Sequence, residues 1–247
     1  MNRRKVIGVL GGMGPLATVD LYQKIIEETP AERDQDHLHV IIESNPAVPD
    51  RSTALLDGGE DPTPLLCEGA RRLEQAGADF IIVPCNTAHA FLPRVAAELS
   101  IPFLSMIDET AKAVARQLPG SVVGILATGG TISARLYQDA FAAEGLESVV
   151  PDAAGQARVS TAIDAVKAGH FGVEQTELLQ ITTAELVELG AQSVIVACTE
   201  LPLILTQSDI AVPLFDPTRI LARAAVAEAL GTAGRSESLD PEGVARR

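Results

Sequence analysis

The chain has 247 residues, of which 47% are hydrophobic and 21% charged, a composition typical of a globular protein. Its formal net charge of -14 at pH 7 repels phosphate backbones and anionic lipid surfaces, so we expect no nucleic-acid and no membrane partner. No apolar run approaches the roughly 20 residues that span a bilayer, and the first residues lack a signal-peptide core. The sequence therefore predicts a cytoplasmic protein whose three cysteines are free thiols.

Short segments rich in Val and Ile alternate along the chain with Ala- and Leu-rich segments of helical periodicity. In the first half we expect, in chain order, strand Val6–Leu10, helix Leu16–Glu28, strand Val40–Glu43, helix Pro64–Gln75, strand Phe80–Pro84, helix Ala88–Leu99 and a weak strand Phe103–Met106. In the second half we expect helix Ile107–Gln117, strand Val122–Leu126, helix Ile132–Ala143, strand Ser148–Pro151, helix Glu174–Leu189, strands Ser193–Ala197 and Val212–Phe215, and helix Thr218–Leu230. This alternation predicts an α/β fold with parallel strands that are covered on both faces.

An internal repeat divides the chain into two halves of similar order. Residues 77–85 (GADFIIVPC) match residues 190–198 (GAQSVIVAC), and each copy runs from a glycine at a helix end through a buried strand to a cysteine. The repeat predicts two similar lobes. Residues 1–107 with 212–231 are expected to form the first lobe, residues 108–211 the second, and residues 232–247 a disordered tail.

Cys85 and Cys198 end the two copies of the repeated strand, at the edge of a parallel sheet where ligands bind. Lobes related by a pseudo-two-fold axis would bring the two thiols face to face across a cleft. Cysteine is also a common small core residue, and Cys67 is expected to have only that role. The shared register, and the polar pairs Asn86-Thr87 and Thr199-Glu200 that follow, favour a functional role for Cys85 and Cys198.

Two facing thiols have the chemistry to invert a carbon atom beside a carboxylate. A thiolate removes the hydrogen from one face, the thiol on the other face supplies a new one, and the two roles exchange with each turnover. The thiolate is an effective base only when its pKa lies near the operating pH. Helix amino-termini favour a thiolate and also bind carboxylates, so the N–H groups and side chains of Asn86, Thr87 and Thr199 are the expected carboxylate donors.

Three motifs in order, residues 11–18 (GGMGPLAT), 84–89 (PCNTAH) and 197–203 (ACTELPL), resemble those of the aspartate/glutamate racemase family. The resemblance extends from about Lys5 to Leu230. It implies two flavodoxin-like lobes with parallel sheets related by pseudo-two-fold symmetry, with the active site in the cleft between them. It also implies a homodimer and a two-base racemisation that needs no cofactor and no metal.

The same resemblance assigns roles to two cations. Residues 44–51 (SNPAVPDR) resemble the family loop whose arginine, here Arg51, contacts the side-chain carboxylate of the substrate, and residues 163–169 resemble the segment with a partnering lysine, here Lys167. From the residues alone both would be placed on a solvated surface. A guanidinium holds a carboxylate bidentately, so the pair favours aspartate and leaves glutamate open. The full expected substrate-binding set is Met13, Gly14, Asn45, Arg51, Asn86, Thr87, Thr128, Lys167, Thr199 and Glu200.

Several alternatives stay open at this point. Residues 12–17 fit the GxGxxA dinucleotide fingerprint, but Pro15 removes an N–H that would face a pyrophosphate. We expect instead that these glycines let the backbone approach a small carboxylate, with Met13 as a wall of the pocket. Thr128 either hydrogen-bonds the substrate or belongs to a strand-to-helix turn with Thr131 as N-cap.

A Cys–His hydrolase is the alternative from another class of enzyme. His89 lies one helical turn after Cys85, where it could activate the thiol. This interpretation gives Cys198 no role.

A hydantoin racemase or a maleate-type isomerase of the same superfamily also remains as an alternative. The spacings of the His and Cys residues match no metal site.

Overall fold

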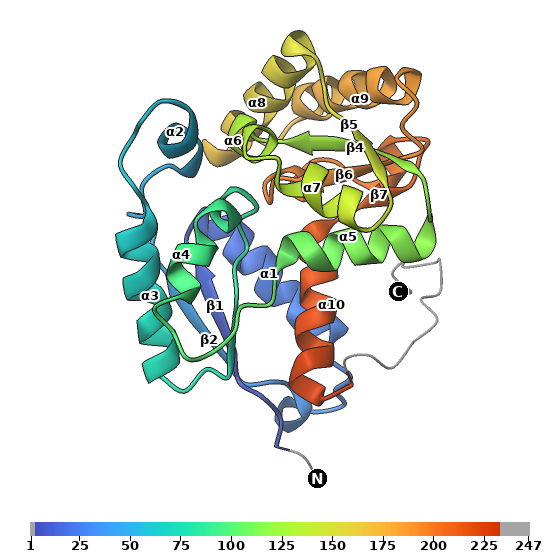
Figure 1. The fold of residues 1–247 in the computed structure, drawn as a ribbon. Helices are drawn as coiled ribbons and strands as arrows, with labels where there is room; N and C mark the ends of the chain where they lie inside the picture. Colours follow the sequence, from blue (N-terminus) through green and yellow to red (C-terminus); the bar gives the residue numbers. More distant parts are fainter. Residues whose placement is uncertain (1–2, 233–247) are drawn as a thin grey trace.

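The computed structural model describes residues 3–232, which form two parallel β-sheets covered by helices (Figure 1). The first sheet has the order β2-β1-β3, with strands β1 (Ile7–Gly11), β2 (Val40–Ser44) and β3 (Phe80–Ile82). The second has the order β5-β4-β6-β7, with strands β4 (Val122–Ala127), β5 (Glu147–Val149), β6 (Ser193–Ala197) and β7 (Leu214–Phe215). The expected α/β fold with two parallel sheets is thus confirmed.

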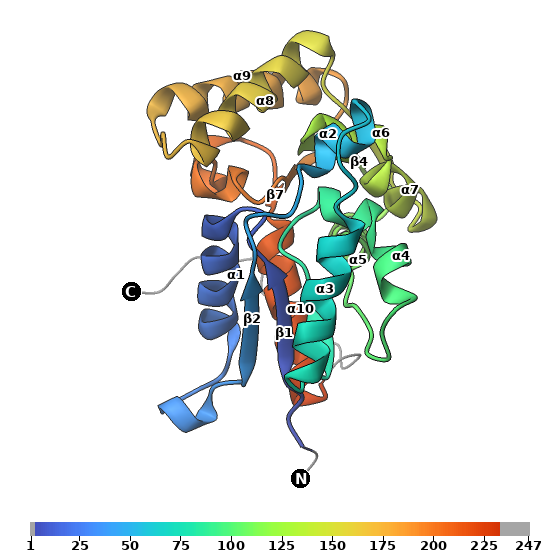
Figure 2. The same ribbon diagram turned by 90° about the vertical axis from the view of Figure 1, so that its left-hand side faces the viewer.

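The first sheet lies between two helix layers, as Figure 2 shows from the side. The layers consist of α1 (Pro15–Glu28) with α10 (Pro217–Leu230) on one face, and α3 (Thr63–Gln75) with the short α4 (Leu92–Ala96) on the other. Ile7 and Val9 of β1 pack with Leu221 and Ala225 of α10, all fully buried. A helix near the end of the chain therefore completes the core around its first strand, because the apolar stripe of α10 matches this face of the sheet.

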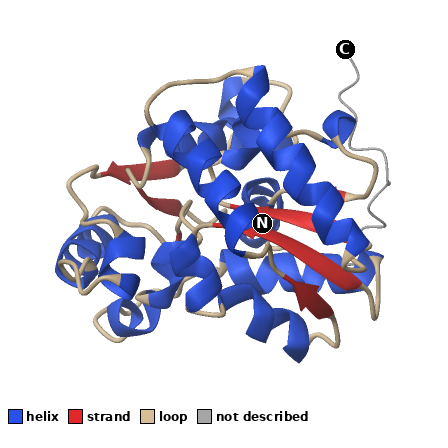
Figure 3. Cartoon of the chain, turned by 90° about the horizontal axis from the view of Figure 1, so that it is seen from above, coloured by secondary structure: helices blue, strands red, loops and turns tan. Residues whose placement is uncertain are grey.

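The second sheet is covered in the same way, and Figure 3 shows helices around both sheets. Its layers are α8 (Ala153–Lys167) with α9 (Val173–Glu188), and α5 (Met106–Gln117) with α7 (Leu136–Ala143). Two short helices, α2 (Arg51–Leu56) from the first lobe and α6 (Gly129–Ser133) from the second, meet between the lobes. A side chain on Gly130 would collide with Ser52, since a Cβ there would lie 2.8 Å from the Ser52 Oγ.

The two copies of the sequence repeat occupy equivalent places in the two sheets. β1 pairs with β3 as β4 pairs with β6. Each copy begins at a glycine that follows a helix and has a left-handed φ, +96° at Gly77 and +101° at Gly190. Glycine adopts this conformation at little cost, and it turns the chain directly from the helix into the strand.

The prediction that all of residues 212–231 belong to the first lobe was wrong for β7. β7 pairs with β6 through Val194–Leu214 and Ile195–Phe215, so it completes the second sheet and not the first. The sequence of such a short apolar strand does not indicate which sheet edge the strand pairs with. α10, from the same segment, does pack in the first lobe. Apart from Thr232, the expected tail lies outside the described residues.

Other differences have local causes. The expected strand at Phe103 is a single bridge to Ile81. The expected helix Ile132–Ala143 is divided at Arg135, whose φ of 54° is left-handed. The sequence analysis missed α8, whose Ala-rich sequence has a weak apolar stripe, and the six-residue α2. Within residues 3–232 no helix is long and apolar enough to cross a membrane.

Candidate active site

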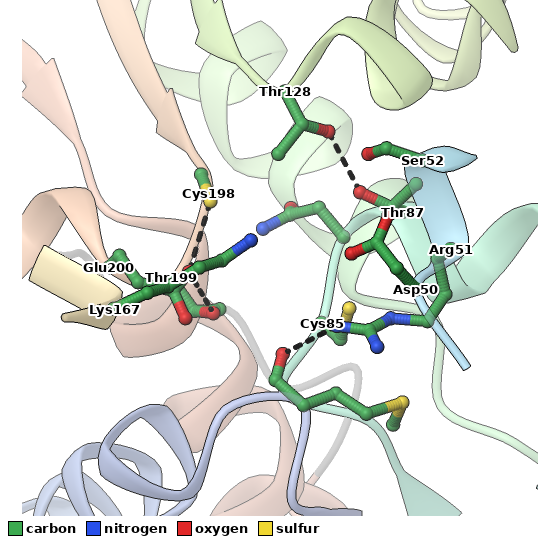
Figure 4. Close-up of a pocket in the computed structure, with 12 residues that line it drawn as sticks. Asp50, Arg51, Ser52, Cys85, Thr87, Thr128, Lys167, Cys198, Thr199 and Glu200 are labelled. Carbon is green, nitrogen blue, oxygen red and sulfur yellow. Dashed lines mark hydrogen bonds between the residues drawn. The ribbon is translucent and has the colours of Figure 1, made fainter. Parts of the chain in front are cut away.

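Cys85 and Cys198 line one pocket between the two lobes (Figure 4). Cys198 directly follows β6, and Cys85 lies three residues after the end of β3. Both cysteines are buried, each with an exposed fraction of 6%. The pocket is small, and side chains from both lobes line it.

Ten of the twelve residues expected at the site line this pocket. They are Met13, Arg51, Cys85, Asn86, Thr87, Thr128, Lys167, Cys198, Thr199 and Glu200. Gly14 and Asn45 do not. The Asn45 side chain accepts a hydrogen bond from the Ala47 N–H at 3.0 Å, and a Cβ on Gly14 would lie 3.4 Å from a Glu200 oxygen, at the margin of the site.

The lining also includes Asp50 and Ser52, which the sequence analysis missed. Asp50 is the N-cap of α2, and its carboxylate accepts hydrogen bonds from the Thr53 N–H at 2.7 Å and from the Thr53 hydroxyl at 3.0 Å. Burial raises the pKa of Asp50, but these bonds and the charges of Arg51 and Lys167 lower it overall. An aspartate three residues before a threonine is a capping signal that could have revealed this helix.

A buried cation lies beside Cys85. The Arg51 guanidinium is held by two carbonyls of its own loop, Val48 at 3.3 Å and Pro49 at 3.2 Å, and by the Met13 carbonyl at 3.4 Å. Burial opposes its charge, but the Cys85 sulfur and nearby carboxylates raise the pKa of Arg51 overall. The guanidinium is therefore electrostatically coupled to this thiol.

A carboxylate lies beside Cys198 instead. The Cys198 thiol donates to a Glu200 oxygen at 3.0 Å, and the Thr199 hydroxyl donates to the same oxygen at 3.3 Å. Burial, and then the charge and hydrogen bond of Glu200, raise the pKa of Cys198 well above its ordinary value, against the opposing charge of Lys167. At neutral pH Cys198 is consequently a thiol, and the two cysteines have opposite electrostatic surroundings.

Two buried N–H donors in the pocket lack an acceptor within the described part of the chain. They are the Nε–H of Arg51 and the amide NH₂ of Asn86. A buried donor without an acceptor costs about 1–3 kcal/mol, and more when the group is charged. An oxygen acceptor from water or from a bound ligand would satisfy each of these donors.

Hydroxyl groups from both lobes meet at the pocket wall. The Thr87 hydroxyl lies 2.9 Å from those of both Thr128 and Thr131. Thr128 is the N-cap of α6 and accepts from the Thr131 N–H at 3.2 Å, so the alternative with Thr131 as N-cap was wrong. Thr128 also lines the pocket, and its hydrogen bond to a substrate stays a prediction.

His89 does not activate Cys85. Its Nδ1–H donates to the Cys85 carbonyl at 2.9 Å, and its Nε2 accepts from the Met106 N–H at 3.2 Å. Burial lowers the pKa of His89, which keeps the ring neutral. Because both ring nitrogens bind the backbone, the geometry contradicts the Cys–His hydrolase interpretation.

The glycine-rich loop has a structural reason for its composition. A Cβ on Gly12 would lie 2.4 Å from the Asn45 backbone, and one on Gly11 would lie 2.4 Å from the Thr18 hydroxyl. Gly11 and Gly12 therefore admit neighbouring protein atoms. Gly14 lies closer to the site, since a Cβ there would be 3.4 Å from a Glu200 oxygen, and the expected approach of this loop to a carboxylate stays a prediction. Met13 lines the pocket. Among the described residues no group of three His, Cys, Asp or Glu side chains is placed to hold a metal ion.

We expect Glu200→Gln to lower the pKa of Cys198, because it removes the negative charge that disfavours the thiolate. The measurement is the pH dependence of thiolate absorbance in a Cys67→Ala/Cys85→Ala background, where Cys198 is the remaining thiol of the three. The midpoint should shift to lower pH with Glu200→Gln and stay in place with Asp50→Asn, which changes a pocket carboxylate farther from this sulfur. An unmoved midpoint with Glu200→Gln would contradict the electrostatic assignment.

Comparison with known proteins finds similarity to amino-acid racemases along almost the whole chain. The model of the Asp/Glu/hydantoin racemase family matches residues 10–225. The broad specificity amino-acid racemase RacX of Bacillus subtilis (strain 168) is 32% identical over 225 residues, which cover 90% of this chain and 96% of RacX. A glutamate racemase of Parafrankia sp. (strain EAN1pec) is 35% identical over 139 residues, but these make up 47% of that protein.

Solved structures share the fold. Picrophilus torridus aspartate racemase superimposes with a TM-score of 0.77 at 31% identity, covering 92% of this chain and 94% of that one. An aspartate racemase homologue from Pyrococcus horikoshii OT3 gives a TM-score of 0.75 at 29% identity, covering 92% and 99%. With the two-lobe fold and the match over residues 10–225, the chain belongs to the Asp/Glu/hydantoin racemase family and is an isomerase.

Proposed function

We propose that the chain racemises aspartate, with glutamate as the longer alternative, by a two-base mechanism that uses Cys85 and Cys198. One observation carries the proposal: the two thiols share a pocket with two buried donors that lack acceptors, the Arg51 Nε–H and the Asn86 amide. A dicarboxylate supplies an acceptor to each donor. It also has the carbon beside a carboxylate that a thiol pair can invert.

The two ends of the substrate bind different donors in this proposal. Asn86, with the hydroxyls of Thr87 and Thr199, binds the carboxylate next to the reacting carbon. Arg51 and Lys167 bind the distal carboxylate. The Lys167 side chain, at the end of α8, has no ion pair among the described residues, so its charge is free for a ligand.

The chemical step is a balanced transfer of protons. The thiolate takes the α-hydrogen as a proton, so the C–H bond breaks and an S–H bond forms. The opposite thiol gives its proton to the other face of the carbanion, so its S–H bond breaks and a C–H bond forms. The product has the inverted configuration, and the two sulfurs have exchanged protonation states.

Cys198 holds its proton in the resting enzyme, because burial and the Glu200 carboxylate disfavour its thiolate. The charged group beside Cys85 is instead the Arg51 guanidinium. The free enzyme therefore starts with an acid already in place at Cys198.

Exchange of the α-hydrogen tests the proposal directly. Wild-type protein in deuterium oxide should incorporate deuterium into both enantiomers of aspartate and interconvert them, without any added cofactor. Asparagine, hydantoins and maleate in the same assay separate the alternative isomerases. If neither enantiomer of aspartate or glutamate exchanged its α-hydrogen, the proposal would be wrong.

We further propose that two copies of the chain associate. Large apolar side chains on one side of α1 are exposed, namely Leu16, Val19, Tyr22 and Ile26. Their spacing forms the stripe of a helix that packs against a partner. Light scattering should give a mass near twice the 25.9 kDa of the chain, and Val19→Asp should halve that mass.

The cytoplasmic location stays a prediction from the sequence.

A further inference from the structure

We propose that Tyr137 is a positioning residue, which fixes the Asn86 amide so that its NH₂ group faces the α-carboxylate of the substrate. The inference rests on the proposed racemisation of an acidic amino acid, and it adds a residue from the second lobe to the binding of that substrate. Tyr137 does not line the pocket and acts only through Asn86.

A buried hydrogen bond joins the two residues across the lobes. Tyr137 lies on α7 of the second lobe and is 0% exposed, and Asn86 follows Cys85 in the first lobe and is 3% exposed. The Tyr137 hydroxyl donates to the Asn86 Oδ1 at 2.5 Å. A short, fully buried hydrogen bond between side chains restricts both of them strongly.

This bond determines which end of the amide remains available. An asparagine side chain can turn over by 180° with little change in shape, so a neighbour must select its orientation. Tyr137 uses the oxygen, and the NH₂ group is left buried without an acceptor in a residue that lines the pocket. The opposite orientation would direct a carbonyl oxygen at the substrate carboxylate and repel it.

The neighbouring donor is held in a similar way. Thr87 is hydrogen-bonded by Thr128 and Thr131 of the second lobe, at 2.9 Å in each case. Both residues after Cys85 are thus oriented by side chains from the other lobe. Tyr137 therefore belongs to a set of contacts that adjusts the binding loop of the first lobe to the position of the second.

The internal repeat supplies a matched control. The tripeptide Leu-Tyr-Gln follows the first strand of each half, as residues 21–23 on α1 after β1 and as residues 136–138 on α7 after β4, so Tyr22 matches Tyr137. It is 40% exposed and has no side-chain hydrogen bond to a pocket residue within the described chain. Tyr22→Phe removes the same atom as Tyr137→Phe at the matching position of the other lobe, and it keeps the apolar ring that the proposed contact between two copies uses.

A double-mutant cycle tests the inference, with kcat and KM measured for both enantiomers of aspartate. Tyr137→Phe should raise KM about three- to tenfold, the size of one neutral hydrogen bond, and Tyr22→Phe should leave KM unchanged. In an Asn86→Ala background, Tyr137→Phe should have no further effect, because the group through which it acts is gone. Equal losses in both backgrounds would show a purely structural role and overturn the inference, as would an unchanged KM.

A second variant covers the case in which Tyr137→Phe fails to fold. Asn86→Asp keeps an oxygen acceptor for the Tyr137 hydroxyl and nearly the same volume, but it removes the NH₂ donor. KM should then rise at least as much as with Asn86→Ala, and an unchanged KM would overturn the inference. Absence of exchange in the wild type would contradict the proposed function instead, so the two failures are distinguishable.

Discussion

Cys198→Ala is expected to lower the rate of aspartate inversion by about 10²–10⁴-fold, the usual contribution of one acid or base group. With only Cys85 left, the proton can leave and return on one face alone. One enantiomer should therefore exchange its α-hydrogen for deuterium without inverting, while the other stays inert. Cys85→Ala should show the opposite preference. The measurements are chiral chromatography for inversion and proton NMR for exchange.

Cys67→Ala is the matched control for both cysteine variants. Its thiol lies in the core of the first lobe on α3, away from the pocket, and a common small residue should replace it without loss of inversion. A Cys198→Ala enzyme that inverted aspartate at the wild-type rate would exclude the two-base mechanism. One that retained a hydrolytic activity at Cys85 would restore the Cys–His interpretation, which the hydrogen bonds of His89 contradict.

Arg51→Lys is expected to reduce kcat/KM for aspartate by about 30-fold or more, since breaking a buried, hydrogen-bonded charge pair costs about 2–5 kcal/mol. Lysine keeps the positive charge but loses the planar fork that holds a carboxylate by two hydrogen bonds. The substituted enzyme should also distinguish aspartate from asparagine far less well, because these substrates differ only at the distal group.

The ratio of kcat/KM for aspartate and asparagine is therefore the measurement that decides the role of Arg51. Arg135→Lys serves as the control, because its guanidinium is exposed and pairs with Asp139 of α7, outside the pocket. If Arg51→Lys lowered kcat/KM for both substrates equally, the cation would act on Cys85 and not on the distal carboxylate.

The repeat in the sequence predicted the two sheets well because it marks the buried strands, whose composition follows from their burial. Buried parallel strands require continuous Val and Ile, and each cysteine follows such a strand, so matching segments predicted two matching sheets. The destination of β7 was not predictable, because its pairing with β6 depends on the path of the chain in space.

The site was predictable where its residues lie next to the motifs, and unpredictable where packing brings them in. Asn86, Thr87, Thr199 and Glu200 follow the cysteines directly in the chain. Tyr137 reaches Asn86 from 51 positions away, through a contact that only the assembled lobes create. Ser52 and Asp50 were missed because the short helix α2 has no periodic pattern to reveal it.

The unequal surroundings of the two cysteines can make kcat and KM differ between the two enantiomers, but the equilibrium constant limits how they differ. Mirror-image amino acids have equal free energies in water, so the equilibrium constant of racemisation is one. The ratio kcat/KM must then be equal for the two enantiomers, however much the charges beside Cys85 and Cys198 differ. The asymmetry of the site can change kcat and KM only in proportion, so the enantiomer with the lower KM must also have the lower kcat.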